Sequence, residues 1–464
     1  MTDVAVFRAT GAGVAAAVAA HEAGARTVLV EPTAHVGGMV SGGLSWTDVG
    51  DTRVLGGFAR RFHQAVADRY GARLWELRGP EPHVAEEILV ELLDGIDVVE
   101  ELPDATVTID ASYEGDVLAA RGVPFSVGRE SRSLYGERWA GRQPAYRPSK
   151  HNFEVLLSPF GDDGSLLPHI RQPRLGEDGW PEEALGEGDG GLQAYGFRVC
   201  LTNRDPVPFE EPPGYDPAEF ALLDRYRAAR PDAELMGLVP DLLPNGKCDV
   251  NSIGPFSLNV LDGSNRDYLD GDRAAVRAHH LAYTKRFLYH VAPEGWGLCA
   301  DEFTDTDGWP HQLYVREARR MRGSYVLRED DLVHARLHDD VIALGSYNID
   351  VREIERTWRY LPEYVPKPAV FNEGYLSIPV SAYPIPYRCL TPERDDATDL
   401  LVPVCLSASH VAFSSLRMEP TFMLLGHAAG VAAAQAARRG VAVQDVDVSQ
   451  LQDDLRHQGQ VLSL

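Results

Sequence analysis

An acidic residue, Glu31, is the first position of this chain whose type and spacing indicate chemistry. It stands 18 residues after Gly13, and the segment between them has the small, alanine-rich composition of a helix that packs closely on a sheet. In a strand–turn–helix–strand unit, an acid about 20 residues after the glycine turn binds the ribose hydroxyls of a dinucleotide. Residues 4–31 therefore predict such a unit, with Glu31 as the ribose-binding acid.

The turn of this unit departs from the usual dinucleotide pattern, G-x-G-x-x-G. Arg8, Thr10 and Gly13 occupy the three glycine positions, so only the third glycine is present. The glycines of this pattern allow the tight turn, the close approach of the pyrophosphate and the packing of the helix on the strand. Two interpretations stay open. Either Thr10 and Gly13 contact a nucleotide, or this is an ordinary βαβ unit in which Gly13 only packs closely.

The segment that follows Glu31 is unusually rich in glycine. Four glycines fall in the seven positions from 37 to 43. Backbone without Cβ atoms can approach a flat or phosphorylated ligand closely. We expect this segment to contact the ligand through Gly37, Gly38, Met39, Gly42 and Gly43.

A second glycine-rich segment lies far downstream, at residues 426–430. We expect a long, alanine-rich helix to start there. The N–H groups at a helix start can stabilise the anion of a reduced flavin, which makes this segment a candidate cofactor contact. Arg417 and Glu419 precede this helix, and an ion pair that holds the turn is favoured for them over catalysis. The alternative is that the glycines only allow tight packing. The residues expected to bind the cofactor here are Arg417, Glu419, Gly426, Ala429 and Gly430.

Two histidines and two arginines are candidates for catalysis. His410 follows the apolar run Leu400 to Val404, at a strand-to-loop exit where cofactor clefts open. Histidine titrates near neutrality and can accept a proton as hydride leaves a substrate. Arg316 and Arg388 lie among aromatic residues and can orient a carboxylate or sugar oxygen, and His311 is a second acid–base candidate. Structural roles stay open for all four residues.

Composition limits the partners of the chain. It has 464 residues and a formal net charge of −25, so we expect neither nucleic acid nor an anionic membrane as a partner. No apolar run approaches the ~18 residues of a membrane span, and the first residues lack a signal-peptide pattern. The five cysteines are scattered without a CxxC pair, which favours reduced thiols in the cytoplasm over a disulfide framework or a metal site.

Several longer segments match one family pattern: residues 31–43, 46–50, 81–86, 109–116, 128–131, 193–198, 309–318 and 383–430. On these segments the chain resembles the FAD-dependent oxidoreductases related to the fumarate reductase and glutathione reductase superfamily. The resemblance implies an α/β fold with a Rossmann-like FAD-binding lobe built from both chain termini, residues 1–124 and 376–464. It also implies an inserted α+β substrate lobe, residues 125–375. Ala111 and Gly115, after the strand near Ile109, would then lie beside FAD.

Two features of the chain depart from this family pattern. Relatives usually carry a glycine at the position of Arg8, whose guanidinium can either reach the pyrophosphate or fill its place. Relatives also have a hairpin or meander between the helix around Glu86 and the strand around Thr106, where this chain runs almost directly from residues 97–100 into that strand. Both departures affect the adenosine and pyrophosphate half of the cofactor.

The resemblance implies an FAD-dependent oxidoreductase that removes hydride from a CH–OH, CH–NH or CH–CH centre of a small-molecule substrate. Two alternatives stay open. One is a flavin-free member of the family that catalyses a redox-neutral step, as an isomerase, cyclase or lyase, on a natural-product intermediate of secondary metabolism. The other is a non-catalytic binding protein. Neither a metal nor a covalent link to flavin is expected.

Overall fold

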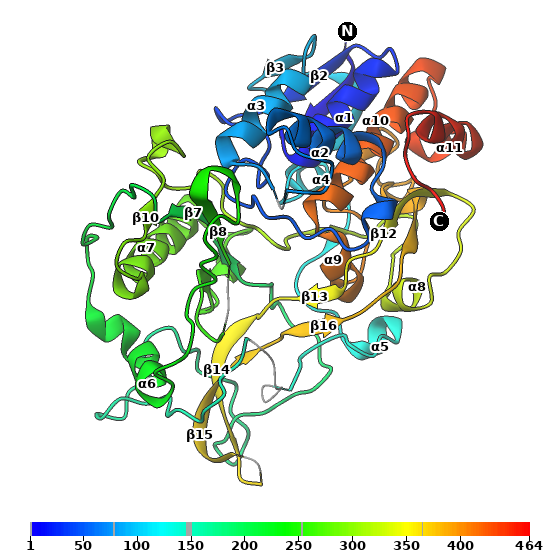
Figure 1. The fold of residues 1–464 in the computed structure, drawn as a ribbon. Helices are drawn as coiled ribbons and strands as arrows, with labels where there is room; N and C mark the ends of the chain where they lie inside the picture. Colours follow the sequence, from blue (N-terminus) through cyan, green and yellow to red (C-terminus); the bar gives the residue numbers. More distant parts are fainter. Residues whose placement is uncertain (1, 78, 145–150, 252–253, 364) are drawn as a thin grey trace. The chain divides into compact units, whose positions relative to one another are not determined.

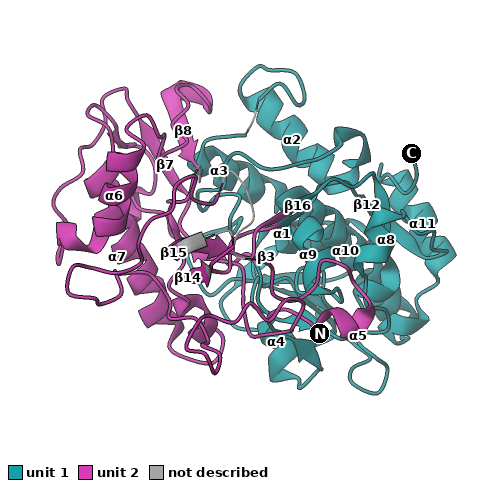
Figure 2. Ribbon diagram, turned by 90° about the horizontal axis from the view of Figure 1, so that it is seen from below, with its two compact units in different colours: residues 1–127, 317–350, 377–464 teal, residues 128–316, 351–376 magenta. Residues whose placement is uncertain are grey.

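The computed structural model of the protein describes residues 2–77, 79–144, 151–251, 254–363 and 365–464. The chain divides into two compact units (Figures 1 and 2). Unit 1 comprises Met1–Val127, Glu317–Asp350 and Ser377–Leu464, and unit 2 comprises Gly128–Arg316 and Val351–Leu376. Residues 317–350, which the sequence places in the insertion, thus belong to unit 1. The functions assigned to the two lobes stay predictions.

A five-stranded parallel sheet forms the centre of unit 1. Its strands follow the spatial order β18-β4-β1-β2-β3, and every neighbouring pair is parallel. Strands from both ends of the chain share this sheet, which confirms the predicted α/β, Rossmann-like fold. The strands are β1 (Thr2–Phe7), β2 (Thr27–Val30), β3 (Asp97–Val99), β4 (Ala105–Asp110) and β18 (Leu400–Leu401).

The apolar runs of the sequence explain why these strands lie inside the unit. Residues 4–6 of β1 are fully buried, as is Leu29 of β2. Runs without polar alternation are typical of parallel strands that are covered on both faces. The short connection predicted before Thr106 is present, since β3 and β4 are separated by residues 100–104 alone.

Two helices of unit 1, α1 (Gly11–Glu22) and α10 (Glu419–Arg439), pack side by side (Figure 1). The predicted start of the second helix at residues 426–430 is wrong, because α10 begins at Glu419. Pro420 in the first turn is the sequence signal for the observed start, since proline has no N–H to leave unpaired there. The residues that this correction moves into the helix interior are Gly426, Ala429 and Gly430.

Glycines in α10 allow the close approach of α1. A Cβ atom on Gly426 would lie 2.1 Å from the carbonyl oxygen of Ala12. A Cβ atom on Gly430 would lie 2.2 Å from the carbonyl oxygen of Ala16. The N–H groups of Gly426 and Gly430 lie beyond the first turn of α10. Helical N–H groups bond within the helix there, so these two are not the open donors of a helix start. The packing interpretation therefore accounts for both glycines.

The remaining elements of unit 1 are short, apart from three helices. These three are α2 (Gly57–Arg69), α3 (Pro82–Leu92) and α11 (Val448–His457). The short elements are α4 (Asp116–Ala120), α8 (Glu329–Val333), α9 (His410–Leu416), β5 (Phe125–Ser126), β11 (Arg320–Met321), β12 (Val341–Gly345) and β17 (Tyr383–Pro386). Strands β13 (Ile349–Val351) and β16 (Leu376–Ile378) each cross a boundary between the units.

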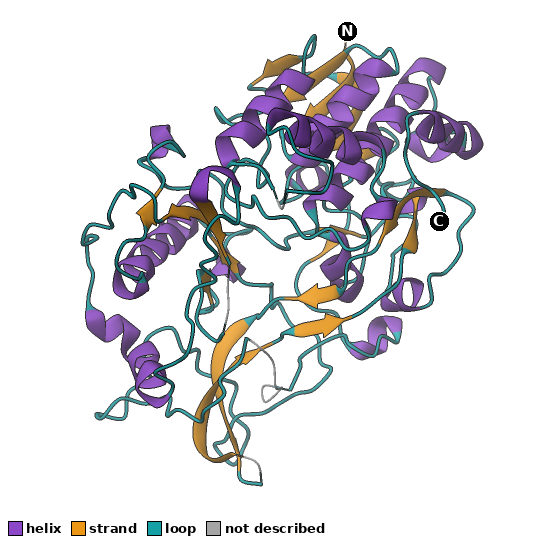
Figure 3. Cartoon of the chain, viewed as in Figure 1, coloured by secondary structure: helices purple, strands orange, loops and turns teal. Residues whose placement is uncertain are grey.

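Unit 2 consists of two longer helices, small antiparallel sheets and extensive loops (Figure 3). Its longest helix is α7 (Arg273–Val291). The other elements are α5 (Arg132–Tyr135), α6 (Ala221–Ala229), β6 (Tyr195–Gly196), β7 (Val199–Thr202), β8 (Lys247–Val250), β9 (Asn259–Val260), β10 (Gly297–Leu298), β14 (Glu355–Leu361) and β15 (Val365–Glu373). None of the helices described in either unit is both long enough and apolar enough to cross a membrane.

Candidate functional site

The turn between β1 and α1 is held by Thr10 and Gly13. The Thr10 hydroxyl caps α1, since it accepts a hydrogen bond from the Gly13 N–H (3.1 Å) and donates one to the Ala111 carbonyl (2.8 Å). A Cβ atom on Gly13 would lie 1.9 Å from the carbonyl oxygen of Arg8. The structure thus gives Gly13 the helix-to-strand packing role of the third fingerprint glycine.

Glu31 is buried and bound on every side by the protein itself. Its Oε1 accepts hydrogen bonds from the Arg8 guanidinium (2.6 Å), the Thr33 N–H (3.0 Å) and the Thr33 hydroxyl (2.8 Å). Its Oε2 accepts one from the Ala9 N–H (2.9 Å). Each carboxylate oxygen offers two lone pairs, so these donors fill Oε1 and leave one acceptor site on Oε2. The predicted ribose-binding acid is therefore engaged by Arg8 and its neighbours.

The glycine-rich segment after β2 packs against protein groups. Gly37 and Gly38 have φ values of +113° and +58°, in the region that favours glycine. The Gly37 N–H donates to the Ala9 carbonyl (2.6 Å), and a Cβ atom on Gly38 would lie 2.6 Å from the Tyr113 hydroxyl. Gly42 and Gly43 continue the segment and are buried, the latter with a φ of +114°.

Tyr113 and Glu419 form a buried chain of hydrogen bonds with the glycine-rich segment. The Met39 N–H donates to the Tyr113 hydroxyl (2.9 Å), and this hydroxyl donates to Oε1 of Glu419 (2.7 Å). Burial raises the pKa of Glu419 to about 7. Sequence reasoning missed Tyr113, although it lies between two residues that were selected, Ala111 and Gly115.

The other oxygen of Glu419 lies at the start of α1. Among the described residues Oε2 has no hydrogen-bond partner, and it would lie 3.2 Å from a Cβ atom on Gly11. Gly11 is the first residue of α1, and Glu419 is the first residue of α10. Two helix starts therefore meet at a buried carboxyl group with one open oxygen. Gly115 lies at a third helix start, that of α4, where its N–H donates to the Ser112 hydroxyl (2.9 Å).

His410 is bound to an acidic residue that the sequence did not indicate. It is the first residue of α9, and it is 2% exposed. Its Nδ1 lies 2.8 Å from Oε1 of Glu317, which also accepts a hydrogen bond from the buried Arg320. Because a carboxylate can only accept, the Nδ1 atom of His410 carries the proton in this contact. The basic lone pair of the neutral ring is then on Nε2.

Two of the selected arginines in unit 1 pair with aspartates. Arg417 donates to the carbonyl (2.7 Å) and carboxylate (3.0 Å) of Asp350, so the turn before α10 is held by this pair and not by Glu419. The Nε and one terminal nitrogen of Arg388 donate to Asp340 (2.9 and 3.1 Å), and its side chain is 45% exposed. These contacts favour structural roles for both arginines.

The other two catalytic candidates belong to unit 2. Arg316 donates to the Ala194 carbonyl, and its guanidinium lies 4.2 Å from the centre of the Tyr314 ring. His311 lies against Phe303, with ring centres 5.7 Å apart. That these residues act on one substrate together with His410 stays a prediction.

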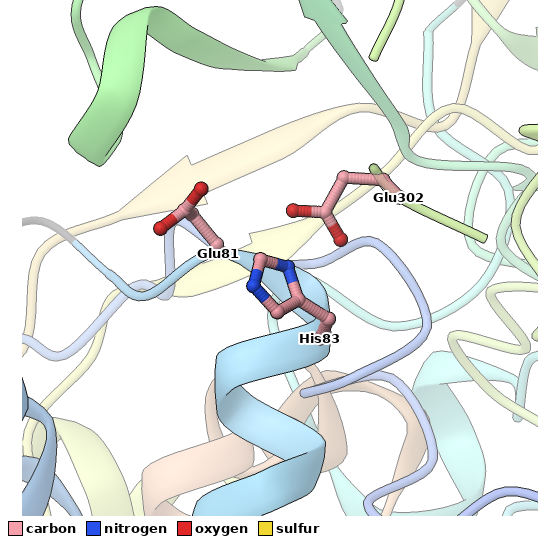
Figure 4. A group of neighbouring side chains, drawn as sticks. All are labelled: Glu81, His83 and Glu302. Atoms are coloured by element: carbon pink, nitrogen blue, oxygen red, sulfur yellow. The ribbon is translucent and has the colours of Figure 1, made fainter. Parts of the chain in front are cut away.

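Figure 4 shows three side chains of types that can bind metals, Glu81, His83 and Glu302. Glu81 and His83 lie at the start of α3 in unit 1 (Figure 4), and Glu81 accepts a hydrogen bond from the Tyr70 hydroxyl (2.9 Å). In unit 2, Glu302 accepts one from Lys247 (2.6 Å). Both carboxylates thus have partners inside their own units, and the expectation that the chain binds no metal stays a prediction.

The comparison with protein families matches residues 3–103 and 100–455 to the model described as FAD dependent oxidoreductase. The chain belongs to this family. Membership confirms the predicted resemblance, the class of flavin-dependent oxidoreductase enzymes and FAD as the cofactor of that class. A search of curated proteins finds no match.

Similar solved structures share only a low level of similarity. The OxyS anhydrotetracycline hydroxylase from Streptomyces rimosus is 15% identical over 28% of this chain and 35% of its own, with a TM-score of 0.22. THI4 from Thermovibrio ammonificans is 15% identical over 28% of this chain and 66% of its own, with a TM-score of 0.21. A steroid monooxygenase bound to NADP is 13% identical over 38% of this chain and 34% of its own, with a TM-score of 0.18.

The residues of unit 1 fit FAD better at one end than at the other. Oε2 of Glu419 lies at the start of α1, and burial favours the protonated carboxyl, which can donate to a phosphate or flavin oxygen; the ionised form would repel a phosphate. The hydroxyls of Thr10 and Tyr113 already donate to Ala111 and Glu419. At the adenosine end, the Arg8 guanidinium occupies Oε1 of Glu31, and an acceptor site is left only on Oε2, which has the Ala9 N–H as its one donor.

Proposed function

We propose that the protein removes hydride from a CH–OH, CH–NH or CH–CH centre of a small molecule. FAD, when bound, supplies the hydride acceptor in this class of enzymes. The observation that carries the proposal is the buried pair of His410 and Glu317, in the unit that also contains the nucleotide-binding type of sheet. A histidine held in one tautomer by a carboxylate is a common general base.

His410 would accept the substrate proton at Nε2. Glu317 orients the ring through Nδ1 and stabilises the imidazolium that forms when the proton arrives. Arg320 donates a charge-assisted hydrogen bond to the same carboxylate oxygen of Glu317 and so helps to hold it in place. Arg316 and Arg388 stay proposals for orienting the substrate, and the Asp340 contact of Arg388 makes it the weaker of the two. His311 stays a second acid–base candidate.

The proposal is tested by anaerobic mixing of the FAD-loaded protein with candidate alcohols, amines and saturated acids. Loss of the visible flavin absorbance would report hydride removal. His410→Gln should slow this loss by roughly 10²- to 10⁴-fold, the usual contribution of a general base, and should leave FAD binding unchanged. Equal rates in both proteins with a reactive substrate would contradict the role of His410.

The Arg8–Glu31 ion pair favours one alternative, a flavin-free member that catalyses an isomerisation, cyclisation or lyase step on a natural-product intermediate. Colourless protein that fails to take up added FAD would exclude hydride removal and would support this alternative. If the protein then converts a compound without oxidising it, the protein is an enzyme of this redox-neutral kind and not a binding protein.

A further inference from the structure

We infer that the Arg8–Glu31 ion pair replaces the ribose contact of this family, so that the chain recognises a flavin nucleotide by its flavin and phosphate half. The inference rests on the proposed function, because it concerns the same cofactor site. Its consequence is a specificity: FMN, which lacks the adenosine half, should bind nearly as tightly as FAD.

The first support is the occupation of Oε1 of Glu31 by protein donors. The side chain of Glu31 is only 4% exposed, and Oε1 accepts from Arg8 and from the Thr33 backbone and hydroxyl, which leaves one acceptor site on Oε2. A ribose hydroxyl at Oε1 would have to displace the guanidinium, which is a charged donor at 2.6 Å. A neutral hydroxyl is a weaker donor to a carboxylate than a guanidinium, so this exchange is unfavourable.

The second support is the rigid position of Arg8. Its backbone has a φ of +75°, in the region that favours glycine, and its N–H donates to the Val30 carbonyl (2.8 Å). The carbonyl oxygen of Arg8 lies where Gly13 leaves room for it, 1.9 Å from the site of a Cβ atom. The turn therefore fixes the arginine backbone beside Glu31, and only the side chain can move away.

The other end of the site lacks such a block. Oε2 of Glu419 lies beside Gly11 at the start of α1, and its protonated carboxyl, which burial favours, can donate to a phosphate oxygen. A phosphate group there does not need the Glu31 carboxylate. The geometry thus separates the two halves of the cofactor, because the Arg8–Glu31 pair stands at the ribose contact and not at the phosphate contact.

The test is the affinity of the full chain for FAD and for FMN, measured by equilibrium dialysis. For the natural sequence we expect the two dissociation constants to lie within about tenfold of each other. Arg8→Gly and Arg8→Ala should each lower the dissociation constant of FAD by about 10- to 100-fold, the value of one or two hydrogen bonds to a charged group. The dissociation constant of FMN should change by less than about threefold. Arg8→Ala keeps a side chain on the left-handed backbone, so it separates the effect of the guanidinium from relief of backbone strain.

Arg26→Ala is the matched control. Arg26 forms an ion pair with Asp3 (2.6 Å), but this pair is exposed and lies at the opposite end of β1. The Arg26→Ala variant should change the affinity neither for FAD nor for FMN. The inference is overturned if the natural chain binds FAD more than about 100-fold tighter than FMN, or if neither Arg8 variant tightens FAD. A natural chain that binds neither FMN nor FAD would overturn the inference and the proposed function together, whereas similar affinities for both without hydride removal would support the inference and contradict the proposed oxidoreductase function.

Discussion

Several side chains of the site meet partners that neutralise or saturate them. Glu31 is held by Arg8, and Glu317 lies between Arg320 and His410. Glu419 differs, because its only described partner is the Tyr113 hydroxyl and burial raises its pKa to about 7. The protonation state of Glu419 therefore changes near neutral pH.

Glu419 should make the stability of the protein depend on pH. An acid whose pKa is raised by folding supports the folded state fully below its unfolded pKa, near 4.5, and this support is lost as the pH rises through about 7. We expect Glu419→Gln to match the natural chain at pH 4.5 and to exceed its free energy of unfolding at pH 8 by roughly 3 kcal/mol. Urea denaturation of both proteins across this range is the measurement. If the free energies of unfolding of the two proteins differ by the same amount at every pH, folding does not raise the pKa of Glu419.

The helix pair α1 and α10 connects the first residues of the chain with the last ones. Both helices are rich in alanine, and α10 has glycines where α1 comes closest. Strands β7 and β10 of unit 2 give a second example of pairing between distant segments, because they bring the free thiols of Cys200 and Cys299 to 3.7 Å. The sequence predicted that both chain ends share one lobe, but it did not indicate the thiol contact.

Gly430→Ala tests the packing of α1 on α10. Helix propensity alone favours alanine over glycine by about 1 kcal/mol. The added Cβ would lie 2.2 Å from the Ala16 carbonyl oxygen, so we expect a loss of roughly 1–3 kcal/mol in the free energy of unfolding. The control is Gly190→Ala in an exposed loop, where a Cβ would meet nothing within 4 Å and the change should stay below about 0.5 kcal/mol. A gain in stability for Gly430→Ala would contradict the observed packing.

Over the full chain, unit 1 is assembled from three separate segments, and its sheet takes strands from both termini. The candidate cofactor contacts are distributed in the same way, at the start of α1, after β4 and at the start of α10. A ligand bound there would therefore stabilise segments that are hundreds of positions apart in the sequence.

Saturating FAD should slow amide hydrogen exchange at both chain ends together. We expect protection at residues 8–14, 110–116 and 418–424, because a ligand that binds only the folded site stabilises every segment that forms it. Mass spectrometry of peptides with and without FAD is the measurement. Protection confined to one end of the chain would contradict a site built from both.

Local patterns were enough to predict part of this protein. The strand–turn–helix–strand unit predicted over residues 4–31 is present as β1, α1 and β2. Family-like segments predicted the Rossmann-like fold and FAD. These features depend on neighbours within one strand or helix, or on motifs that are read directly along the chain. The start of α10 was misplaced because attention to glycine outweighed the proline signal at residue 420.

The partners of the polar residues followed from tertiary structure alone. Residue types made Glu31, His410 and Glu419 candidates, but nothing in the sequence showed that Arg8 pairs with the first, Glu317 orients the second and Tyr113 binds the third. A hydrogen bond depends on distances of a few tenths of an ångström between atoms, and these are determined by how the sheet and helices pack. The types and order of the residues define which chemistry is available, and the long-range packing defines which groups remain open to a ligand.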